Sequence, residues 1–458
     1  MRLAPTMEHA KPVKRPAIVA ALIETFGFSP AVASAVVFLF VLAAAGATFW
    51  IIRAAPPRTV VLTSGPEGSS FQRWAEAYQK ALAEHDVTLE IRPSTGSLDN
   101  LQRLQAGQVD LGFVSGGVST DKDLSGLMSL GSVAYQPLLV FYRNPAPLER
   151  LSELAGKQIA VGSTGTAARA LALTLLQANG ITGAPTTFVD LDSSAAAAAL
   201  IEGKLDAVFL MGDSASVQTM RSLMRSADVR LFNFDQADAY VRRYPTLNKI
   251  EFPEGSIDLG RNLPAADITL VGPTVELVAR RELHSALSDL LLDVAKGVHG
   301  KAGLLQKKGE FPAPLEHEFD LSPDALRFYK SGKGFTYRLI PSFWLANLVN
   351  RTLVAVVPLA IILIPVLRLL PLGYRMRIQL KLFKCYRPLQ RLERDSYGQL
   401  SAERVTELQG RLDEIEQAVD ALRVPASFAD QFYELRTHVA FVRQRLNAAQ
   451  TRIEAGKK

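Results

Sequence analysis

Cysteine is nearly absent from this chain, because Cys385 is the only one among 458 residues. The polar segment from Pro56 to Ser342 contains none, so it must hold its fold by core packing, without disulfides. This segment is long enough to bury a core of its own, as one bilobed unit or two small domains. No cysteine ends the first apolar run either, which excludes a lipid-modified anchor there.

Catalytic and metal-binding signatures are also missing. The chain has no G-x-S-x-G, H-E-x-x-H or C-x-x-C pattern, which would indicate a serine hydrolase, a zinc protease or a redox site. Of the histidines, His9 and His438 lie outside the polar segment, and neither His284 nor His299 has a histidine four residues away. We therefore expect no enzyme, no catalytic residue, no metal and no cofactor.

Two long apolar runs are the main feature that the sequence does contain. The first covers residues 31–52 and the second centres on residues 353–367, and about 20 apolar residues suffice to cross a bilayer. Basic residues resist translocation, so both termini are expected in the cytoplasm and the middle segment on the far side. The basic residues that flank the two runs are Lys11, Lys14, Arg15, Arg368, Arg375, Arg377, Lys381, Lys384, Arg387 and Arg391.

Each run has an alternative interpretation. Pro358 and Pro365 interrupt the second run, as in a buried core helix, but prolines are tolerated in membrane helices and the basic flank favours a span. The first run could be a cleaved signal peptide, although it exceeds the usual apolar core of about 7–15 residues. We therefore expect a cytoplasmic segment at 1–30, spans at 31–52 and 343–370, an exported domain at 56–342, and a cytoplasmic part at 371–458.

The exported segment alternates between strand and helix patterns. Strands are expected at 59–63, 87–91 and 110–114, separated by helices at 71–82 and 98–104. Such alternation predicts parallel strands joined by helical crossovers. The order then repeats, which predicts a second, similarly built lobe. Its strands are expected at 158–161, 186–189 and 206–210, and its helices at 167–177 and 195–201.

Three further elements connect the two lobes. A strand at 138–142 should cross between them, the chain should return to the first lobe near 267–271, and a helix at 275–294 should finish the domain. Because ligands of open α/β sheets sit beyond the carboxyl ends of strands, two facing lobes predict a cleft lined by the turns after those strands.

Two of these turns are rich in glycine and hydroxyl groups. The first, Ser64–Phe71, offers Gly65, Ser69, Ser70 and Phe71, and taken alone it also fits an ordinary helix N-cap. The second offers Ser163, Thr164, Gly165 and Thr166 at a helix start. It lacks the lysine of a P-loop, so nucleotide hydrolysis is disfavoured. Together the two turns favour a shared anionic ligand.

Other turn residues complete the candidate set. Thr95, Ser97 and Asn100 can donate to a ligand or cap the helix that follows. Ser115 follows the third strand of the first lobe, and Met211 and Gly212 follow its counterpart in the second. Tyr135 enters the crossing strand, where its ring could face the cleft or belong to the core.

Several motifs resemble the TAXI-type solute-binding proteins of TRAP transporters. They are S-G-P-E-G-S-S-F at 64–71, S-T-G-S-L-D-N-L at 94–101, L-Q-A-G-Q-V-D-L-G at 104–112, L-A-G-K-Q-I-A-V-G-S at 154–163 and I-E-G-K-L-D-A at 201–207. The resemblance covers about residues 58–294. It implies a two-lobed, periplasmic-binding-protein-like α/β clamshell, with lobe 1 at 58–143 and 255–340 and lobe 2 at 144–254.

The same resemblance implies a function and a place in the cell. We expect a two-pass protein of the bacterial inner membrane whose periplasmic domain captures a small carboxylate, such as an amino acid, dicarboxylate or 2-oxoacid. A TRAP permease would be its partner. The chain departs from the family at three places. More glycine and two tyrosines are usual at Ser69–Gln72, a glutamine at Ser115 and a proline at Met211–Asp213.

The part after Pro388 extends beyond an ordinary binding protein. Apolar residues recur every three or four positions from Leu408 to Leu422 and again from Phe428 to Leu446, with a break at Pro425. This pattern predicts an α-helical hairpin or coiled coil. It could simply end the protein, or residues 388–455 could bind a cytoplasmic partner or a second copy, which would suit a transmembrane sensor. The basic flank suits anionic lipid rather than nucleic acid.

Overall fold

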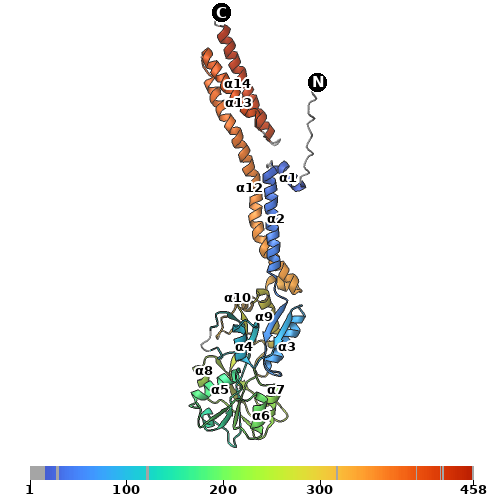
Figure 1. Ribbon diagram of the computed structural model, residues 1–458, viewed down its shortest axis with the longest axis vertical. Helices are drawn as coiled ribbons and strands as arrows, with labels where there is room; N and C mark the ends of the chain where they lie inside the picture. The colour runs from blue at the N-terminus through green and yellow to red at the C-terminus, as the bar shows by residue number, and fades with distance from the viewer. Residues whose placement is uncertain are drawn as a thin grey trace, which may run out of the picture. The chain divides into compact units, whose positions relative to one another are not determined.

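The computed structural model describes residues 16–26, 30–119, 123–315, 318–398, 400–422, 424 and 428–455 (Figure 1). The chain divides into two compact units, one of residues Ala55–Asn350 and one that joins the first 54 residues to Arg351–Lys458. Several residues of the sequence argument lie outside the described residues, namely His9, Lys11, Lys14, Arg15 and Pro425.

The first lobe of unit 55–350 is built on a mixed sheet with the strand order β10-β11-β3-β1-β2, and β4 pairs with β11. Its strands are β1 (Thr59–Thr63), β2 (Thr88–Arg92), β3 (Leu111–Ser115), β4 (Leu127–Tyr135), β10 (Leu247–Phe252) and β11 (Ile268–Arg280). Strand β1 is parallel to β2 and β3, whereas β11 is antiparallel to its neighbours.

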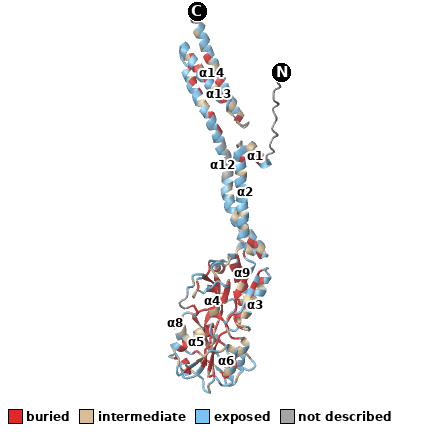
Figure 2. Cartoon of the chain, in the orientation of Figure 1, coloured by how far each residue is buried: buried red, intermediate tan, exposed pale blue. Residues whose placement is uncertain are grey.

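Helices cover both faces of this sheet. Apolar residues of α3 (Ser70–Ala83), α9 (Ser285–His299) and α10 (Pro323–Ser331) share one core cluster with β1, β3, β4 and β11. The opposite face receives α4 (Ser97–Gln105) through Leu101 and Leu104. Figure 2 shows the buried residues gathered along these strands. A short helix, α11 (Phe335–Leu339), precedes the end of the unit.

The second lobe contains a five-stranded sheet in the order β7-β6-β8-β5-β9. Its strands are β5 (Leu139–Tyr142), β6 (Gln158–Ala160), β7 (Thr187–Val189), β8 (Ala207–Leu210) and β9 (Arg230–Leu231). Helices α6 (Ser193–Ile201) and α7 (Val217–Arg225) pack in one cluster, and α5 (Ala167–Ala178) and α8 (Ala237–Arg243) in another. A 3₁₀ turn, η1 (Leu151–Leu154), follows β5. The predicted two-lobed α/β fold is therefore confirmed.

One predicted element is wrong. Residues 275–280, expected to begin a helix, are the second half of strand β11, and helix α9 begins only at Ser285. The reason is tertiary: β11 lies between β3 and β4, and its residues from Leu270 to Ala279 are buried. A strand buried on both faces loses the alternating pattern that would distinguish it from a buried helix. Strands β4 and β10 and helices α7 and α8 were not predicted.

The chain crosses between the lobes just before β5. The Gln136 and Leu138 backbone amides donate to the carbonyls of Pro273 (2.8 Å) and Val271 (2.9 Å). The crossing segment, residues 136–138, therefore runs antiparallel to the first part of β11, and Leu138 is also the first residue of the strand predicted to cross.

Within the described residues, two helices are long and apolar enough, by length and composition, to cross a membrane. They are α2 (Pro30–Arg53) and the segment Phe343–Ile362 of α12 (Phe343–Asp395). The first is preceded by α1 (Ala17–Phe26). The first turns of α12 belong to unit 55–350, because Phe343 is buried in its core and the Trp344 indole N–H donates to the His85 carbonyl at 3.0 Å.

The C-terminal part contains the expected helical hairpin, and a third helix packs with it. Helices α13 (Ala402–Asp420) and α14 (Ala429–Ala455) run antiparallel, since Arg443 pairs with Asp413 (2.6 Å) and Arg436 with Asp420. The end of α12 joins them, with Leu389 and Leu392 in the shared core. The third helix supplies the apolar surface that a hairpin alone would leave exposed.

A buried carboxyl group lies in the centre of the first sheet. Glu276 on β11 is fully buried, and neither of its side-chain oxygens has a partner at hydrogen-bond geometry. Burial and, to a smaller degree, the charge of Glu318 raise the pKa of Glu276 from 4.5 to about 7, although the nearby Ser129 side chain opposes this rise. The folded state therefore binds this proton more tightly than the unfolded state. Because the unfolded state loses the proton first, the free energy of unfolding falls as the pH rises from 4.5 to 7.

We expect Glu276→Gln to remove this pH dependence. A shift of this size corresponds to about 3 kcal/mol between pH 4.5 and 8. The variant should unfold with a flatter pH profile than the wild type and be more stable at pH 8. Urea unfolding of residues 55–350 measures both quantities. Glu251→Gln, an exposed carboxylate on β10, is the matched control and should keep the wild-type profile; equal profiles for wild type and Glu276→Gln would contradict the assignment.

Candidate functional site

The N-termini of three helices meet where the two lobes face each other. Helix α3 follows β1, α4 follows β2, and α5 follows β6, so each begins at the carboxyl end of a strand, as the sequence predicted. Ser69 caps α3 by accepting from the Gln72 amide, and Thr166 caps α5 by accepting from the Arg169 amide (both 3.2 Å). The hydroxyls of Ser69 and Thr166 therefore act as helix N-caps.

Backbone hydrogen bonds join the lobes directly at these helix starts. The Ser70 amide donates to the Gly212 carbonyl at 2.8 Å, and the amides of Leu98 and Asp99 donate to the Gly165 carbonyl at 3.1 and 3.2 Å. Ser69 and Ser216 also form an isolated antiparallel bridge. Backbone amides in the first turns of α3 and α4 could have bound a ligand. Three of them, those of Ser70, Leu98 and Asp99, donate to the opposite lobe instead.

A carboxylate of the protein itself lies between α4 and α5. Asp213 is fully buried, and its Oδ2 accepts from the backbone amides of Ala167 (2.8 Å) and Ser97 (3.3 Å). Its Oδ1 accepts from the Ser214 hydroxyl at 2.9 Å. Burial raises the pKa of Asp213, and these three donors oppose that rise. The partial positive charge of two helix N-termini stabilises an anion at this point, and the anion present is Asp213.

Two glycines allow this close contact. A Cβ on Gly96, whose φ is 148°, would lie 2.8 Å from Asp213 Oδ2, and one on Gly165, whose φ is 93°, would lie 2.5 Å from the Thr95 hydroxyl. Both the positive φ angles and the lack of space exclude a side chain. Gly165, in the second predicted anion-binding turn, and Gly96, just before α4, therefore serve contact between the lobes.

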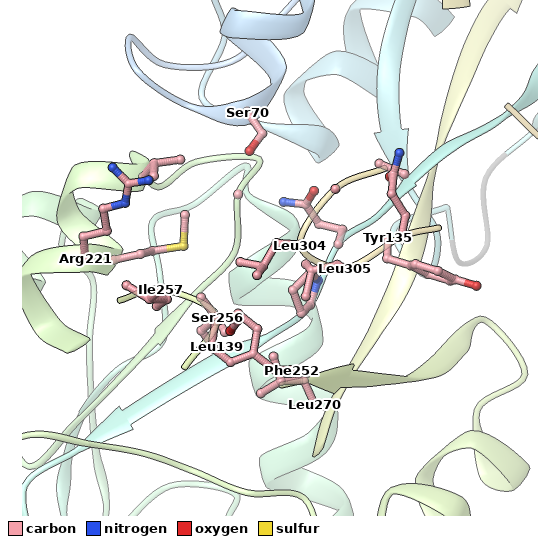
Figure 3. A pocket seen from close by; sticks show the side chains of 18 of the residues that line it. Ser70, Tyr135, Leu139, Arg221, Phe252, Ser256, Ile257, Leu270, Leu304 and Leu305 are labelled. Atoms are coloured by element: carbon pink, nitrogen blue, oxygen red, sulfur yellow. The ribbon is translucent and has the colours of Figure 1, made fainter. Parts of the chain in front are cut away.

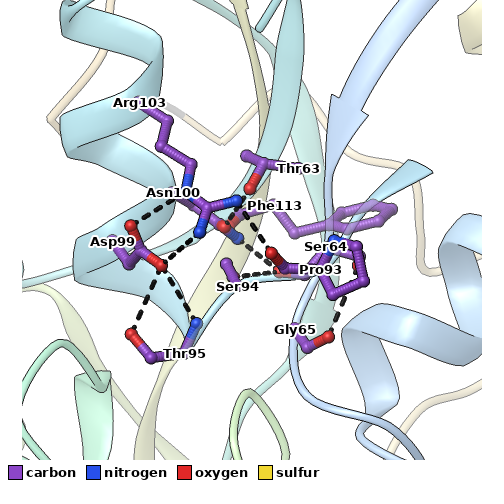
Figure 4. Close-up of polar contacts among 10 residues, drawn as sticks. All are labelled: Thr63, Ser64, Gly65, Pro93, Ser94, Thr95, Asp99, Asn100, Arg103 and Phe113. Carbon is purple, nitrogen blue, oxygen red and sulfur yellow. Dashed lines mark hydrogen bonds and ion pairs between the residues drawn. The ribbon is translucent and has the colours of Figure 1, made fainter. Parts of the chain in front are cut away.

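Asn100 forms a closed polar network beneath α4 (Figure 4). Its side-chain amide donates to the carbonyls of Ser64 (2.7 Å) and Phe113 (2.9 Å), and its oxygen accepts from the Thr63 hydroxyl (2.6 Å). Asn100 is fully buried, so its contacts tie β1, β3 and α4 together. The exposed Thr95 nearby bonds Asp99 through its amide, at 3.0 Å.

The hydroxyls of the second turn also have partners within their own lobe. Ser163 donates to the Leu191 carbonyl (3.0 Å), Thr164 to Asp190 (2.9 Å), and Thr166 to the Ser163 carbonyl (2.7 Å). In the first lobe, the Ser97 hydroxyl accepts from the Ser115 amide at 2.5 Å. These predicted donors therefore bond within their own lobes, and among these bonds only the pairs Thr166–Ser163 and Ser115–Ser97 join two predicted site residues.

Three other predicted site residues belong to the interior. Phe71 and Met211 are fully buried, and Phe71 packs against Trp74 and Phe113. Ser115 is fully buried too, and its hydroxyl oxygen has no hydrogen-bond partner. None of the three lines the pocket described next.

A pocket of about 520 Å³ opens between the lobes beside the Ser70–Gly212 contact (Figure 3). Three predicted site residues line it: Ser70, Tyr135 and Gly212. The other lining residues were not predicted: Arg73, Trp74, Ala134, Gln136, Pro137, Leu139, Val217, Met220, Arg221, Met224, Leu231, Phe252, Ser256, Ile257, Leu270, Gly303, Leu304, Leu305 and Gln306. Its size is typical of small-molecule sites.

The crossing segment forms one wall of this pocket. The Tyr135 hydroxyl donates to Glu310 at 3.0 Å, so only its ring is presented to the pocket. Burial first, and then Glu310, raise the pKa of Tyr135. In the amide orientation that satisfies both groups, the Gln136 side-chain oxygen accepts from the amides of Gly212 and Asp213. Gln136 therefore fixes the turn after β8 against the crossing segment.

Two α/β lobes joined by crossing strands, with a pocket lined from both, define a clamshell of the solute-binding type. A family model described as the NMT1-like family matches residues 71–287, from α3 to the beginning of α9. No curated protein matches the chain. Among the described residues, no group of three or more His, Cys, Asp or Glu side chains is placed to hold a metal ion.

Solved structures give distant likenesses. The periplasmic aliphatic sulphonate-binding protein SsuA of Escherichia coli is 15% identical, with a TM-score of 0.34 over 53% of this chain and 73% of that one. PhnD1 of Prochlorococcus marinus, in complex with methylphosphonate, is 11% identical, with a TM-score of 0.37 over 60% and 97%. An ancestral arginine-binding protein is 14% identical, with a TM-score of 0.35 over 53% and 93%. None of these likenesses identifies a ligand for this chain.

We expect Asp213→Ala to leave an empty anion site between α4 and α5. Two buried amides would lose their acceptor, which costs about 1–3 kcal/mol for each unsatisfied group. Acetate should then stabilise the variant selectively, since a ligand at 100 times its dissociation constant adds about 2.7 kcal/mol. Urea unfolding of residues 55–350 in acetate and in chloride measures this. Ser214→Ala keeps the Asp213 carboxylate, so acetate should not stabilise this control variant selectively. An equal effect of acetate on the wild type and on Asp213→Ala would contradict the placement of an anion site between α4 and α5.

Proposed function

We propose that residues 55–350 form an exported, membrane-tethered domain that binds a small organic acid for a transporter. The observation that carries this proposal is the pocket of about 520 Å³, because both lobes and the crossing segment line it. Ligand pockets occur preferentially at such junctions. Closure of the lobes about the crossing segment would trap the ligand there.

Electrostatics support an acidic ligand. Arg73 on α3 and Arg221 on α7 line the pocket from opposite lobes, and both are exposed. Among the described residues, neither guanidinium pairs with a carboxylate. A ligand carboxylate would supply the missing counter-charge. This location differs from the two glycine-rich turns of the sequence argument, where Asp213 already supplies an anion.

The membrane arrangement is part of the same proposal. Helix α2 and the first half of α12 would be two spans, with both termini in the cytoplasm, because basic residues follow the second run. The motif resemblance supports a TRAP permease as the partner, and the ligand would then be an amino acid, a dicarboxylate or another small carboxylate. The basic flank would contact lipid headgroups.

A second candidate function is a transmembrane sensor. Helix α12 is continuous from Phe343 to Asp395, and it contributes Phe343 to the core of unit 55–350 and Leu389 and Leu392 to the C-terminal bundle. A binding protein that only delivers a ligand has no need of a helix shared by two hydrophobic cores. In a sensor, the bundle would report ligand binding to a cytoplasmic partner.

We expect Met220→Trp to block the pocket without unfolding the domain. Met220 is half-buried on α7 and lines the pocket, so a larger ring would occupy ligand space. A panel of organic acids should raise the melting temperature of the wild-type domain and not of this variant. Ser222→Trp, on an exposed position of the same helix outside the pocket, is the matched control. If Met220→Trp binds as well as the wild type, the ligand lies elsewhere.

Deleting residues 388–458 distinguishes the two candidate functions. We expect cellular uptake of the acid that binds to survive this deletion, because pocket and spans stay intact. Loss of a ligand-dependent cellular response, with uptake unchanged, would instead favour the sensor. Immunodetection of equal amounts in the membrane fraction is the necessary control.

A further inference from the structure

The residues that line the pocket favour a narrower class of ligand than small organic acids in general. None of the residues that line it is an aspartate or a glutamate. An amino acid bound there would bury its ammonium group without a counter-charge, which is strongly unfavourable. The lining therefore disfavours amino acids, although the sequence resemblance includes them.

Among the described residues, two elements contribute charged groups to the pocket. Arg73 on α3 and Arg221 on α7 are the charged residues that line it there, with the Ser70 hydroxyl beside Arg73 (3.4 Å). In Figure 3 the Arg221 guanidinium and the Ser70 hydroxyl lie on the upper side of the pocket. A carboxylate placed there would accept charge-assisted hydrogen bonds from both lobes.

Most of the remaining wall is apolar, and its uncharged polar side chains include those of Gln136, Ser256 and Gln306. Leu139, Phe252, Ile257 and Leu270 lie on the lower side of Figure 3, and Leu304 and Leu305 lie near its centre. Met220 and Met224 of α7 also line the pocket, and unbranched thioether side chains adapt to ligands of varied shape. A second carboxylate on this side would lose its hydration and find no cation in exchange.

We infer that the ligand is an amphipathic monocarboxylate, with its carboxylate between Arg73 and Arg221 and an aryl or alkyl body against the apolar wall. This inference rests on the proposed function and assigns the chemical class of its ligand. Arg73 and Arg221 determine the sign of the charge, and the apolar wall excludes short dicarboxylates. Ligand binding would thus bridge α3 and α7 through a single carboxylate.

The test uses the full-length protein in phosphatidylcholine nanodiscs, with the heat of titration into empty discs subtracted. The probes are 4-phenylbutanoate and octanoate, compared with neutral 4-phenylbutan-1-ol and with glutarate, glutamate and 2-oxoglutarate. We expect the two monocarboxylates to bind, the alcohol to bind at least about tenfold more weakly, and the three polar acids not to bind. The double variant Arg73→Met/Arg221→Met should lose at least about tenfold in affinity.

Arg225→Met is the matched control, since Arg225 is exposed on α7 and does not line the pocket; its affinity should equal that of the wild type. Equal binding of the alcohol and 4-phenylbutanoate, or an unaffected double variant, would overturn the role of the two arginines. Binding of glutarate, glutamate or 2-oxoglutarate without the monocarboxylates would overturn the inference and leave the proposed function standing. If no acid binds while all variants melt like the wild type, both are wrong.

Discussion

The carboxylate of Asp213 is the group on which the arrangement of the lobes depends. It accepts amides from helices of different lobes, Ser97 of α4 and Ala167 of α5, at a position with no exposure to solvent. Removing it would leave two helix N-termini facing each other with unsatisfied donors and repelling dipoles. The close contact between α4 and α5 and the requirement for glycine at 96 both follow from the position of this carboxyl group.

The secondary structure could be predicted where each segment carries a pattern of its own. Strands such as β1 and β8 are short apolar runs between turn residues, and α3 and α4 have helical spacing, so local chemistry sufficed. Strand β11 could not be recognised, because burial on both faces makes its sequence apolar throughout. Its strand character comes from β3 and β4, whose residues are about 140 to 165 positions away in the sequence.

The sequence predicted which residues offer hydrogen-bond donors at the candidate site, but not which groups accept from them. The sequence identifies hydroxyls and glycines at the starts of α3, α4 and α5, yet Asp213 is 116 residues from Ser97 and 46 from Ala167. Only the packing of the lobes brings them together. The one signal for Asp213 in the sequence was a charged residue three positions after the buried strand β8. The pocket walls contributed by α7 and by residues 303–306 have no motif, because apolar side chains in a surface helix or loop look alike in sequence.

The contacts between the lobes are made largely by the main chain. The amides of Ser70, Leu98 and Asp99 donate to the carbonyls of Gly212 and Gly165, so no side chain of these five residues is needed for the pairing. Substitutions at Ser70, Leu98 and Asp99 can therefore keep these hydrogen bonds, whereas Asp213 and the glycines at 96 and 165 are required by their own contacts. Substitutions of the α7 residues that line the pocket also leave these main-chain bonds in place, so the pocket lining can change while the lobes stay joined.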